Sequence, residues 1–240
     1  MEEISLLKTL VNAGIGSRRK VAGAIREGLV QVNGVTVTAF NHLLDINKDL
    51  VIFDGAEIHL KPVDSVYLIL NKPAGVLSTT KDERGRTTIM DFVPPQYKEL
   101  ALYPVGRLDK ASTGLVLLTN DGEVCYRVTH PRFGHEKEYL VRLDQVLEDS
   151  DIDQLRKGVQ LDDGITRPAL VSRVENGAPG EYRIVIHEGK KHIVRRMFAR
   201  LGYMVLELKR TRIASIELGR LGLGETRLLS QKEIQYLQTL

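Results

Sequence analysis

The chain has 240 residues, of which 42% are hydrophobic, so it is long enough to bury the core of one medium-sized domain and one small domain. Its formal net charge of +3 is too small to indicate a partner by itself, and its single cysteine, Cys125, excludes an intramolecular disulfide. Together with the lack of any apolar run of membrane-spanning length, these features predict a cytoplasmic protein with no membrane partner.

Residues 1–61 predict a small domain of two helices followed by a hairpin. Apolar residues repeat at helical spacing over residues 6–11, and Ser17 is placed to cap a second helix. Asn33 and Gly34 lie between two short apolar runs and predict a tight turn of type I′, because these two residues accept the positive φ angles that the turn requires.

Basic side chains gather on the second predicted helix. They are candidates for phosphate contact, because a helix N-terminus adds unpaired amide donors and a positive dipole end to their charge. The residues are Arg18, Arg19, Lys20 and Arg26. A solvated helix face explains them equally well on charge alone, since residues 1–61 hold seven basic and seven acidic side chains.

A proline-containing segment at residues 62–66 predicts a linker to a second domain over residues 67–240. Strands dominate the pattern there, and we expect them at residues 67–70, 115–118, 139–143, 182–186 and 205–208. Helices are expected at residues 193–201 and after the capping box that begins at Ser230. Strands without regular intervening helices predict an α+β domain with a mostly antiparallel sheet.

One acidic residue stands out in the second domain. Asp109 lies between Arg107 and Lys110, just before a short apolar run, and Asp121 after that run is placed to cap a helix. A carboxylate held between cations on a loop next to a rigid strand can stay ionised and reactive. The alternative is a surface aspartate paired with its basic neighbours, and spacing alone favours that alternative.

Four motifs follow one another along the chain, at residues 71–76 (NKPAGV), 106–122 (GRLDKASTGLVLLTNDG), 135–139 (HEKEY) and 188–197 (EGKKHIVRRM). They resemble the motifs of the RsuA/RluB/RluE/RluF family of ribosomal RNA pseudouridine synthases. Residues 1–61 are similar to the RNA-binding domain, named after a ribosomal small-subunit protein, that often precedes these synthases. The resemblance implies a pseudouridine synthase fold, in which helices flank a mostly antiparallel mixed sheet, and ribosomal RNA as the partner.

The resemblance also assigns roles to individual residues. Asp109 would act as a nucleophile or stabilise the sugar cation, and Arg195 would pair with it to keep it ionised and oriented. Tyr139 would stack on the flipped target base, and Arg107 would fill the space that the base leaves. From the residues alone, Arg195 is more simply a solvated arginine and Tyr139 a core side chain.

Further RNA contacts are expected mainly in residues 187–212, which hold eight Lys or Arg against two acidic residues. The remaining candidates are Lys72, Lys190, Lys191 and Arg196. A solvated helix face is the ordinary alternative for this segment. Ile193 departs from the family pattern, in which glutamine commonly follows the histidine of the basic motif.

The implied reaction isomerises uridine in RNA to pseudouridine without a net change of oxidation state. It needs no cofactor, and the sequence contains no nucleotide-binding fingerprint. No metal site is expected, because the spacing of Cys125, His130 and His135 matches no standard zinc pattern. We expect a monomer. Two alternatives remain, namely a non-catalytic RNA-binding factor in ribosome assembly and a pseudouridine synthase that acts on transfer RNA.

Overall fold

A computed structural model of the chain describes residues 4–60 and 64–240, which form two compact units. The first unit extends to Ser65 and includes Pro95–Leu102, and the second comprises Val66–Pro94 and Tyr103–Leu240. The first part of the expected linker, residues 62–63, lies outside the described residues. No helix in the described part of the chain is long and apolar enough to cross a membrane.

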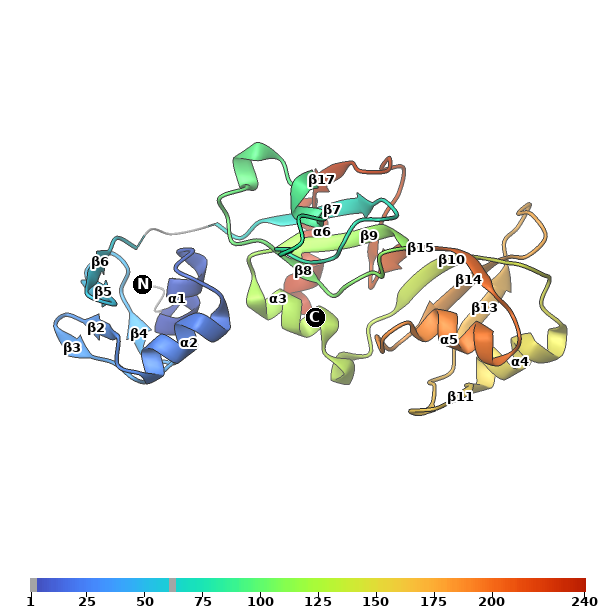
Figure 1. Cartoon of the computed structure of the whole chain (residues 1–240), viewed down its shortest axis with the longest axis horizontal. Coiled ribbons are helices and arrows are strands. Elements are labelled where there is room, and N and C mark those ends of the chain that lie inside the picture. The colour runs from blue at the N-terminus through green and yellow to red at the C-terminus, as the bar shows by residue number, and fades with distance from the viewer. Residues whose placement is uncertain (1–3, 61–63) are drawn as a thin grey trace. The chain divides into compact units, whose positions relative to one another are not determined.

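The first unit consists of short helices and a four-stranded sheet (Figure 1). Its helices are α1 (Leu6–Asn12) and α2 (Arg18–Arg26), and its sheet has the order β3 (Val35–Thr36), β2 (Val30–Val32), β5 (Val51–Phe53) and β6 (Ala56–Ile58). Two further short strands, β1 (Ile4–Ser5) and β4 (Leu43–Leu44), pair with each other, and the short 3₁₀-helix η2 (Pro95–Tyr97) lies in the Pro95–Leu102 segment.

The local signals in residues 1–61 are confirmed. The Ser17 hydroxyl accepts a hydrogen bond from the Lys20 amide and so caps α2. Asn33 and Gly34 have φ angles of 50° and 80°, as a type I′ turn between β2 and β3 requires. The Asn33 side chain also accepts a hydrogen bond from the Leu50 amide at 2.9 Å, which ties the hairpin to the chain entering β5.

A nine-stranded sheet forms the frame of the second unit (Figure 1). Its main path runs β13 (Leu170–Arg173), β14 (Glu181–Ile186), β10 (Lys137–Leu143), β15 (Val205–Ile213), β9 (Thr113–Thr119), β7 (Tyr67–Lys72) and β17 (Thr226–Leu228), with β8 (Tyr103–Val105) paired to β9 and β16 (Ile216–Glu217) paired to β15. β15 and β9 are parallel, and the other pairings of this sheet within the described residues are antiparallel. The predicted α+β class with a mostly antiparallel mixed sheet is therefore confirmed.

Four α-helices accompany the sheet, together with a small hairpin outside it. The helices are α3 (Gly122–Thr129), α4 (Asp149–Lys157), α5 (Ile193–Arg200) and α6 (Gln231–Thr239), the hairpin is β11 (Gln160–Leu161) with β12 (Gly164–Ile165), and the 3₁₀-helices are η1 (Ile89–Phe92) and η3 (Pro131–Phe133). As predicted, Asp121 caps α3 by accepting hydrogen bonds from the amides of Glu123 and Val124, and Ser230 opens a capping box on α6.

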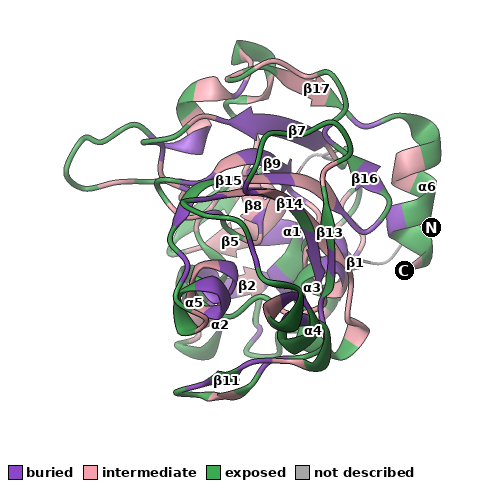
Figure 2. Ribbon diagram, turned by 90° about the vertical axis from the view of Figure 1, so that its right-hand side faces the viewer, coloured by how far each residue is buried: buried purple, intermediate pink, exposed green. Residues whose placement is uncertain are grey.

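The core of the second unit lies against its central strands. β7 is buried along its whole length and β9 from Gly114 onward, as their continuous purple colour in Figure 2 shows. Leu115 and Leu117 of β9 pack in one apolar cluster with side chains from α3 and α6. A strand that is covered on both faces needs apolar side chains at every position, which explains the unbroken apolar run at residues 115–118. The loop that enters β9 is thereby fixed to the most rigid part of the unit.

Candidate active site

The loop that carries Asp109 connects β8 to β9 and is braced by the segment that leaves β7. The Ser78 hydroxyl donates a hydrogen bond to the Leu108 carbonyl at 2.9 Å and accepts one from the Leu108 amide at 3.1 Å. The Gly75 amide donates to the Lys110 carbonyl at 2.8 Å. These bonds hold the backbone on both sides of Asp109, so the position of its Cα atom in the loop is fixed.

Lys72 at the end of β7 belongs to this brace. It is fully buried, and its ammonium group donates hydrogen bonds to the carbonyls of Pro73 and Val76 at 2.9 Å and of Lys110 at 3.3 Å. Burial lowers the pKa of Lys72 to about 8, although the charge of Asp109 acts in the opposite direction. Because this buried ammonium group is already bonded to three carbonyls, the structure does not favour the predicted contact of Lys72 with RNA.

A pocket with a volume of about 270 Å³ opens beside the Asp109 loop. Its walls come from the Asp109 loop, β10, β15 and residues 189–192 before α5, which we call the basic loop. The lining residues include Asp109, Arg107, Tyr139, Lys191, His192, Ser112, Lys137 and Arg210. Asp109 has a side chain that is 33% exposed, Arg107 is exposed, and Tyr139 is buried. The fold thus brings together three of the four residues predicted to be catalytic, although 32 positions separate Arg107 from Tyr139 in the sequence.

The side chain that contacts the Asp109 carboxylate is His192. Its Nε2 atom lies 3.2 Å from Oδ1 of Asp109, and the histidine is about half exposed. His192 is the N-cap residue of α5 and adopts a left-handed conformation with φ 54° and ψ 25°. This conformation is uncommon for a residue with a side chain and clusters at functional sites, and here it accompanies the contact between His192 and the carboxylate.

The predicted pairing of Arg195 with Asp109 is not present in this structure. Nη1 of Arg195 donates a hydrogen bond to the Val205 carbonyl at 2.7 Å, and the side chain lines a separate shallow hollow that also includes Asp144. The reason is helical geometry. Successive residues of a helix turn by about 100°, so position 195 lies about 200° around α5 from Ile193, which faces the Asp109 pocket.

The other predicted basic residues divide into exposed and paired groups. Arg18, Arg19 and Lys20 are exposed in the first turn of α2, and Arg26 is exposed with its guanidinium 5.7 Å from the centroid of the Phe40 ring. Lys191 is exposed at the pocket. These positions are accessible to a polyanion.

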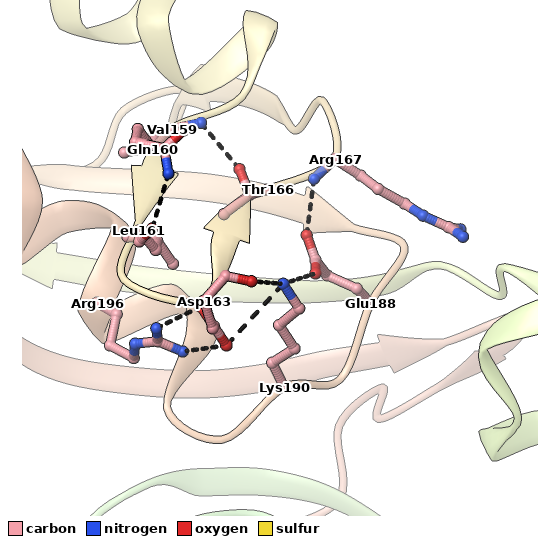
Figure 3. A network of polar contacts seen from close by, with 9 residues as sticks. All are labelled: Val159, Gln160, Leu161, Asp163, Thr166, Arg167, Glu188, Lys190 and Arg196. Carbon is pink, nitrogen blue, oxygen red and sulfur yellow. Dashed lines mark hydrogen bonds and ion pairs between the residues drawn. The ribbon is translucent and has the colours of Figure 1, made fainter.

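Lys190 and Arg196 are held by a cluster of acidic residues, which we call the acidic clasp (Figure 3). Asp163, in the turn between β11 and β12, accepts hydrogen bonds from Nη1 and Nη2 of Arg196 at 3.2 and 2.5 Å and lies 3.9 Å from Nζ of Lys190. These hydrogen bonds from Arg196 lower the pKa of Asp163. Glu188 completes the clasp, because it lies 3.9 Å from Lys190 and accepts a hydrogen bond from the Arg167 amide. The clasp fixes the basic loop that carries His192.

The pocket also includes residues that were not assigned to the active site from the sequence, among them Ser112, Lys137, His192 and Arg210. Arg210 did carry a signal, because a charged residue in a strand with buried neighbours at Leu208 and Ile213 calls for a partner or a function. His192 gave no such signal, since a histidine beside two lysines is ordinary in a basic surface loop. Only its contact with Asp109 distinguishes it.

Cys125, His130 and His135 do not converge. Cys125 lies in α3, whereas His130 caps η3 by accepting a hydrogen bond from the Arg132 amide. In the part of the chain that the structure describes, no group of three or more His, Cys, Asp or Glu side chains is arranged to hold a metal ion.

Two known families match this sequence. Residues 66–200, which include the Asp109 loop, Tyr139 and the basic loop, match the RNA pseudouridylate synthase family. The chain therefore belongs to this family and is an enzyme that isomerises uridine in RNA. Residues 5–48 match the S4 domain, an RNA-binding module, and correspond to the helices and first hairpin of the first unit.

Several known proteins are similar over nearly the whole chain. Ribosomal large subunit pseudouridine synthase B of Bacillus subtilis (strain 168) is 35% identical over 240 residues, covering 98% of this chain and 96% of that protein. Dual-specificity RNA pseudouridine synthase RluF of Salmonella typhi is 36% identical over 230 residues, covering 95% and 76%. A crystal structure described as a pseudouridylate synthase superposes with a TM-score of 0.68 at 33% identity, covering 98% and 99%. The resemblance that the four motifs indicated is confirmed.

Proposed function

We propose that this enzyme converts one or more uridines of ribosomal RNA to pseudouridine and that Asp109 is its catalytic carboxylate. The substrate class is supported by the similar Bacillus subtilis protein, whose name specifies the large ribosomal subunit. The observation that carries the proposal is the position of Asp109. Its partly exposed carboxylate lies on a braced loop at a pocket that also holds Tyr139 and a basic loop.

The pocket residues have distinct tasks in this proposal. A uridine that leaves the RNA helix loses its stacking, and the buried ring of Tyr139 offers a replacement surface. Arg107 is exposed at the pocket, where it can occupy the space that the base leaves. The exposed Lys191 and the S4 residues Arg18, Arg19 and Lys20 bind phosphate groups.

The reaction breaks one bond at the sugar and forms another. The N1–C1′ bond breaks with its electron pair on uracil, which leaves C1′ electron-poor beside the Asp109 carboxylate. Uracil then turns in the pocket and C5 forms the new bond to C1′. One proton is lost from C5 and one is gained at N1, so substrate and product are isomers. His192 orients the Asp109 carboxylate through its contact with Oδ1.

The proposal includes a monomeric enzyme in the cytoplasm that uses no cofactor. A single cysteine fits a reducing compartment, and the reaction as written consumes no electrons or nucleotide. The pocket is built from residues of one unit of one chain, so it does not need a second copy.

The decisive variant is Asp109→Asn, which keeps the shape of the side chain and removes its charge. We expect a rate loss of about 10³-fold or more in single-turnover assays, which is typical when a catalytic carboxylate is lost, with RNA affinity nearly unchanged. Ribosomal RNA tritiated at uracil C5 reports the reaction directly, because the new bond displaces that hydrogen. Asp162→Asn is the matched control, since Asp162 is an exposed carboxylate that does not line the pocket.

The same assay separates the alternatives. Tritium release by Asp109→Asn at the wild-type rate would remove Asp109 from the mechanism. Tritium release from transfer RNA but not from ribosomal RNA would change the substrate and keep the chemistry. Binding of ribosomal RNA without any release by the wild type would favour a ribosome-assembly factor.

A further inference from the structure

Two residues that line the Asp109 pocket each carry a buried polar atom without a hydrogen-bond partner. The two atoms are Oγ of Ser112, a residue with no exposed surface, and Nη2 of Arg210, a residue that is 2% exposed. Four buried side-chain atoms among the described residues lack a partner, and these two belong to residues that line the same pocket. Unsatisfied buried groups are rare in folded proteins, and a pair in one pocket points to a ligand that completes them.

Other hydrogen bonds hold the Arg210 side chain and the Ser112 backbone in place. Nε of Arg210 donates a hydrogen bond to the Leu115 carbonyl at 2.8 Å, which fixes the guanidinium group and leaves Nη2 over. The Ser112 amide donates to the Asp109 carbonyl at 3.0 Å, so the hydroxyl moves with the catalytic loop. These two donors are therefore preorganised relative to Asp109.

Arg210 also lies beside the expected stacking surface. Tyr139 in β10 and Arg210 in β15 are direct partners across the sheet, and both line the pocket. Lys137, another lining residue, has a pKa that is lowered by burial and by the charge of Arg210. This wall of the pocket is thus rich in positive charge and suits a group on which negative charge develops.

We propose that Arg210 and Ser112 recognise the polar edge of the flipped uracil, with Arg210 donating a hydrogen bond to a uracil carbonyl oxygen. This inference rests on the proposed active site at Asp109. Uracil presents carbonyl oxygens O2 and O4 on either side of an N3–H group, and a guanidinium donor matches either oxygen. Ser112, which can donate or accept, meets the neighbouring polar atom. Cytosine has an amino group in place of O4, so its amino donor would meet the guanidinium donor of Arg210 and no hydrogen bond could form.

The same hydrogen bond assists the chemistry. When the N1–C1′ bond breaks, the electron pair that remains on uracil spreads over N1, O2 and O4. A buried cation that already faces one of these oxygens stabilises that charge without reorganising. Arg210 then contributes both to the choice of base and to the rate.

Sulfur substitution in the substrate tests the hydrogen bond, because a thiocarbonyl sulfur accepts hydrogen bonds poorly. The probes are ribosomal RNA transcripts made with uridine, 2-thiouridine or 4-thiouridine, and the readout is the isomerised nucleoside after single turnover. We expect the wild type to be slowed about 10- to 100-fold by one of the two substitutions, as for a hydrogen bond to a charged donor. In Arg210→Lys the uridine reaction itself is slower, and the sulfur penalty shrinks to less than about threefold. In Ser112→Ala the uridine reaction is also slower, but the sulfur penalty stays, because Arg210 still faces the carbonyl.

Arg212→Lys is the matched control, because Arg212 lies in the same strand but bonds to Glu136 and the Ala214 carbonyl. It should retain the full sulfur penalty. If Arg210→Lys does not fold, the wild type still tests the hydrogen bond, because one of the two thio probes must slow it. A full sulfur penalty in Arg210→Lys, or none in the wild type with either probe, would overturn the proposal. If the proposal were overturned in this way while Asp109→Asn still lost activity, the assignment of Asp109 to the active site would remain. Only the role of Arg210 and Ser112 in recognising uracil would be removed.

Discussion

The backbone of Gly114 lies against the backbone of Arg210 where β9 and β15 run in parallel. The two residues are register partners, and Gly114 has a φ angle of +100°. A Cβ atom at position 114 would lie 2.2 Å from the carbonyl oxygen and 2.7 Å from the amide nitrogen of Arg210. This close approach joins the two halves of the sheet at the pocket, and only glycine permits it.

Gly114→Ala should therefore destabilise the second unit strongly, because both the clash and the positive φ oppose a side chain. We expect the free energy of unfolding to fall by more than about 3 kcal/mol, beyond the usual effect of a point substitution. Thermal melting measures the change. Gly189→Ala is the control, since nothing lies within 4 Å of a Cβ atom at that pocket residue. Equal melting temperatures for both variants would show that the strands separate easily at this point.

Lys72 predicts a pH dependence of stability. Its pKa falls from 10.5 to about 8 on folding, which corresponds to a penalty of about 3 kcal/mol while the side chain is charged. Below pH 8 the lysine is charged in both states, so the folded state carries the full penalty. Between pH 8 and 10.5 the folded state has lost the proton that the unfolded state still holds, so this contribution stabilises the fold as the pH rises.

Lys72→Met removes this dependence, and urea unfolding between pH 7 and 10.5 measures it. The stability of the wild type relative to the variant should grow by up to about 3 kcal/mol across that range. Lys81→Met, at an exposed lysine, should show no such trend. A constant difference between wild type and Lys72→Met would mean that Lys72 keeps an ordinary pKa in the folded protein.

The acidic clasp competes with RNA for two cations. Asp163→Asn should release Arg196, whereas Lys190 stays beside Glu188, so that Arg196 contacts phosphate and RNA binding becomes tighter and more dependent on salt. We expect the slope of log K against log salt to steepen by about 0.7, the value for one added phosphate of a single strand. Asp162→Asn tests the general effect of removing an acid next to the clasp. The same slope change in both variants would assign the effect to overall charge and not to the clasp.

The basic cluster on α2 predicts the opposite change. Replacing Arg18, Arg19 and Lys20 together by alanine should lower the salt slope by about 2 if each side chain neutralises one phosphate. Ser17 remains as the helix cap, so α2 should keep its structure. Lys8→Ala, at an exposed lysine of α1, is the single-site reference. An unchanged slope in the triple variant would place the RNA-binding surface of the S4 domain elsewhere.

Local signals in the sequence determined most of the secondary structure. Capping residues such as Ser17, Asp121 and Ser230 act on amides two or three positions away, so their effect is visible in a short stretch of sequence. The same is true of the Asn33-Gly34 turn and of the apolar run in β9. The position of Asp109 before a buried strand, together with the motif around it, likewise marked the loop that lines the pocket.

The partners of these residues were decided by the tertiary structure. His192 reaches Asp109 across 83 positions of sequence, Lys72 turns its ammonium group onto the Asp109 loop, and Arg195 points to Val205. Sequence alone determined which elements form and which loop presents Asp109 ahead of β9, because those depend on nearest neighbours. Whether a cation binds RNA, braces a loop or faces the carboxylate depends on burial and on the face of the helix, and both are set only when the sheet and α5 pack together.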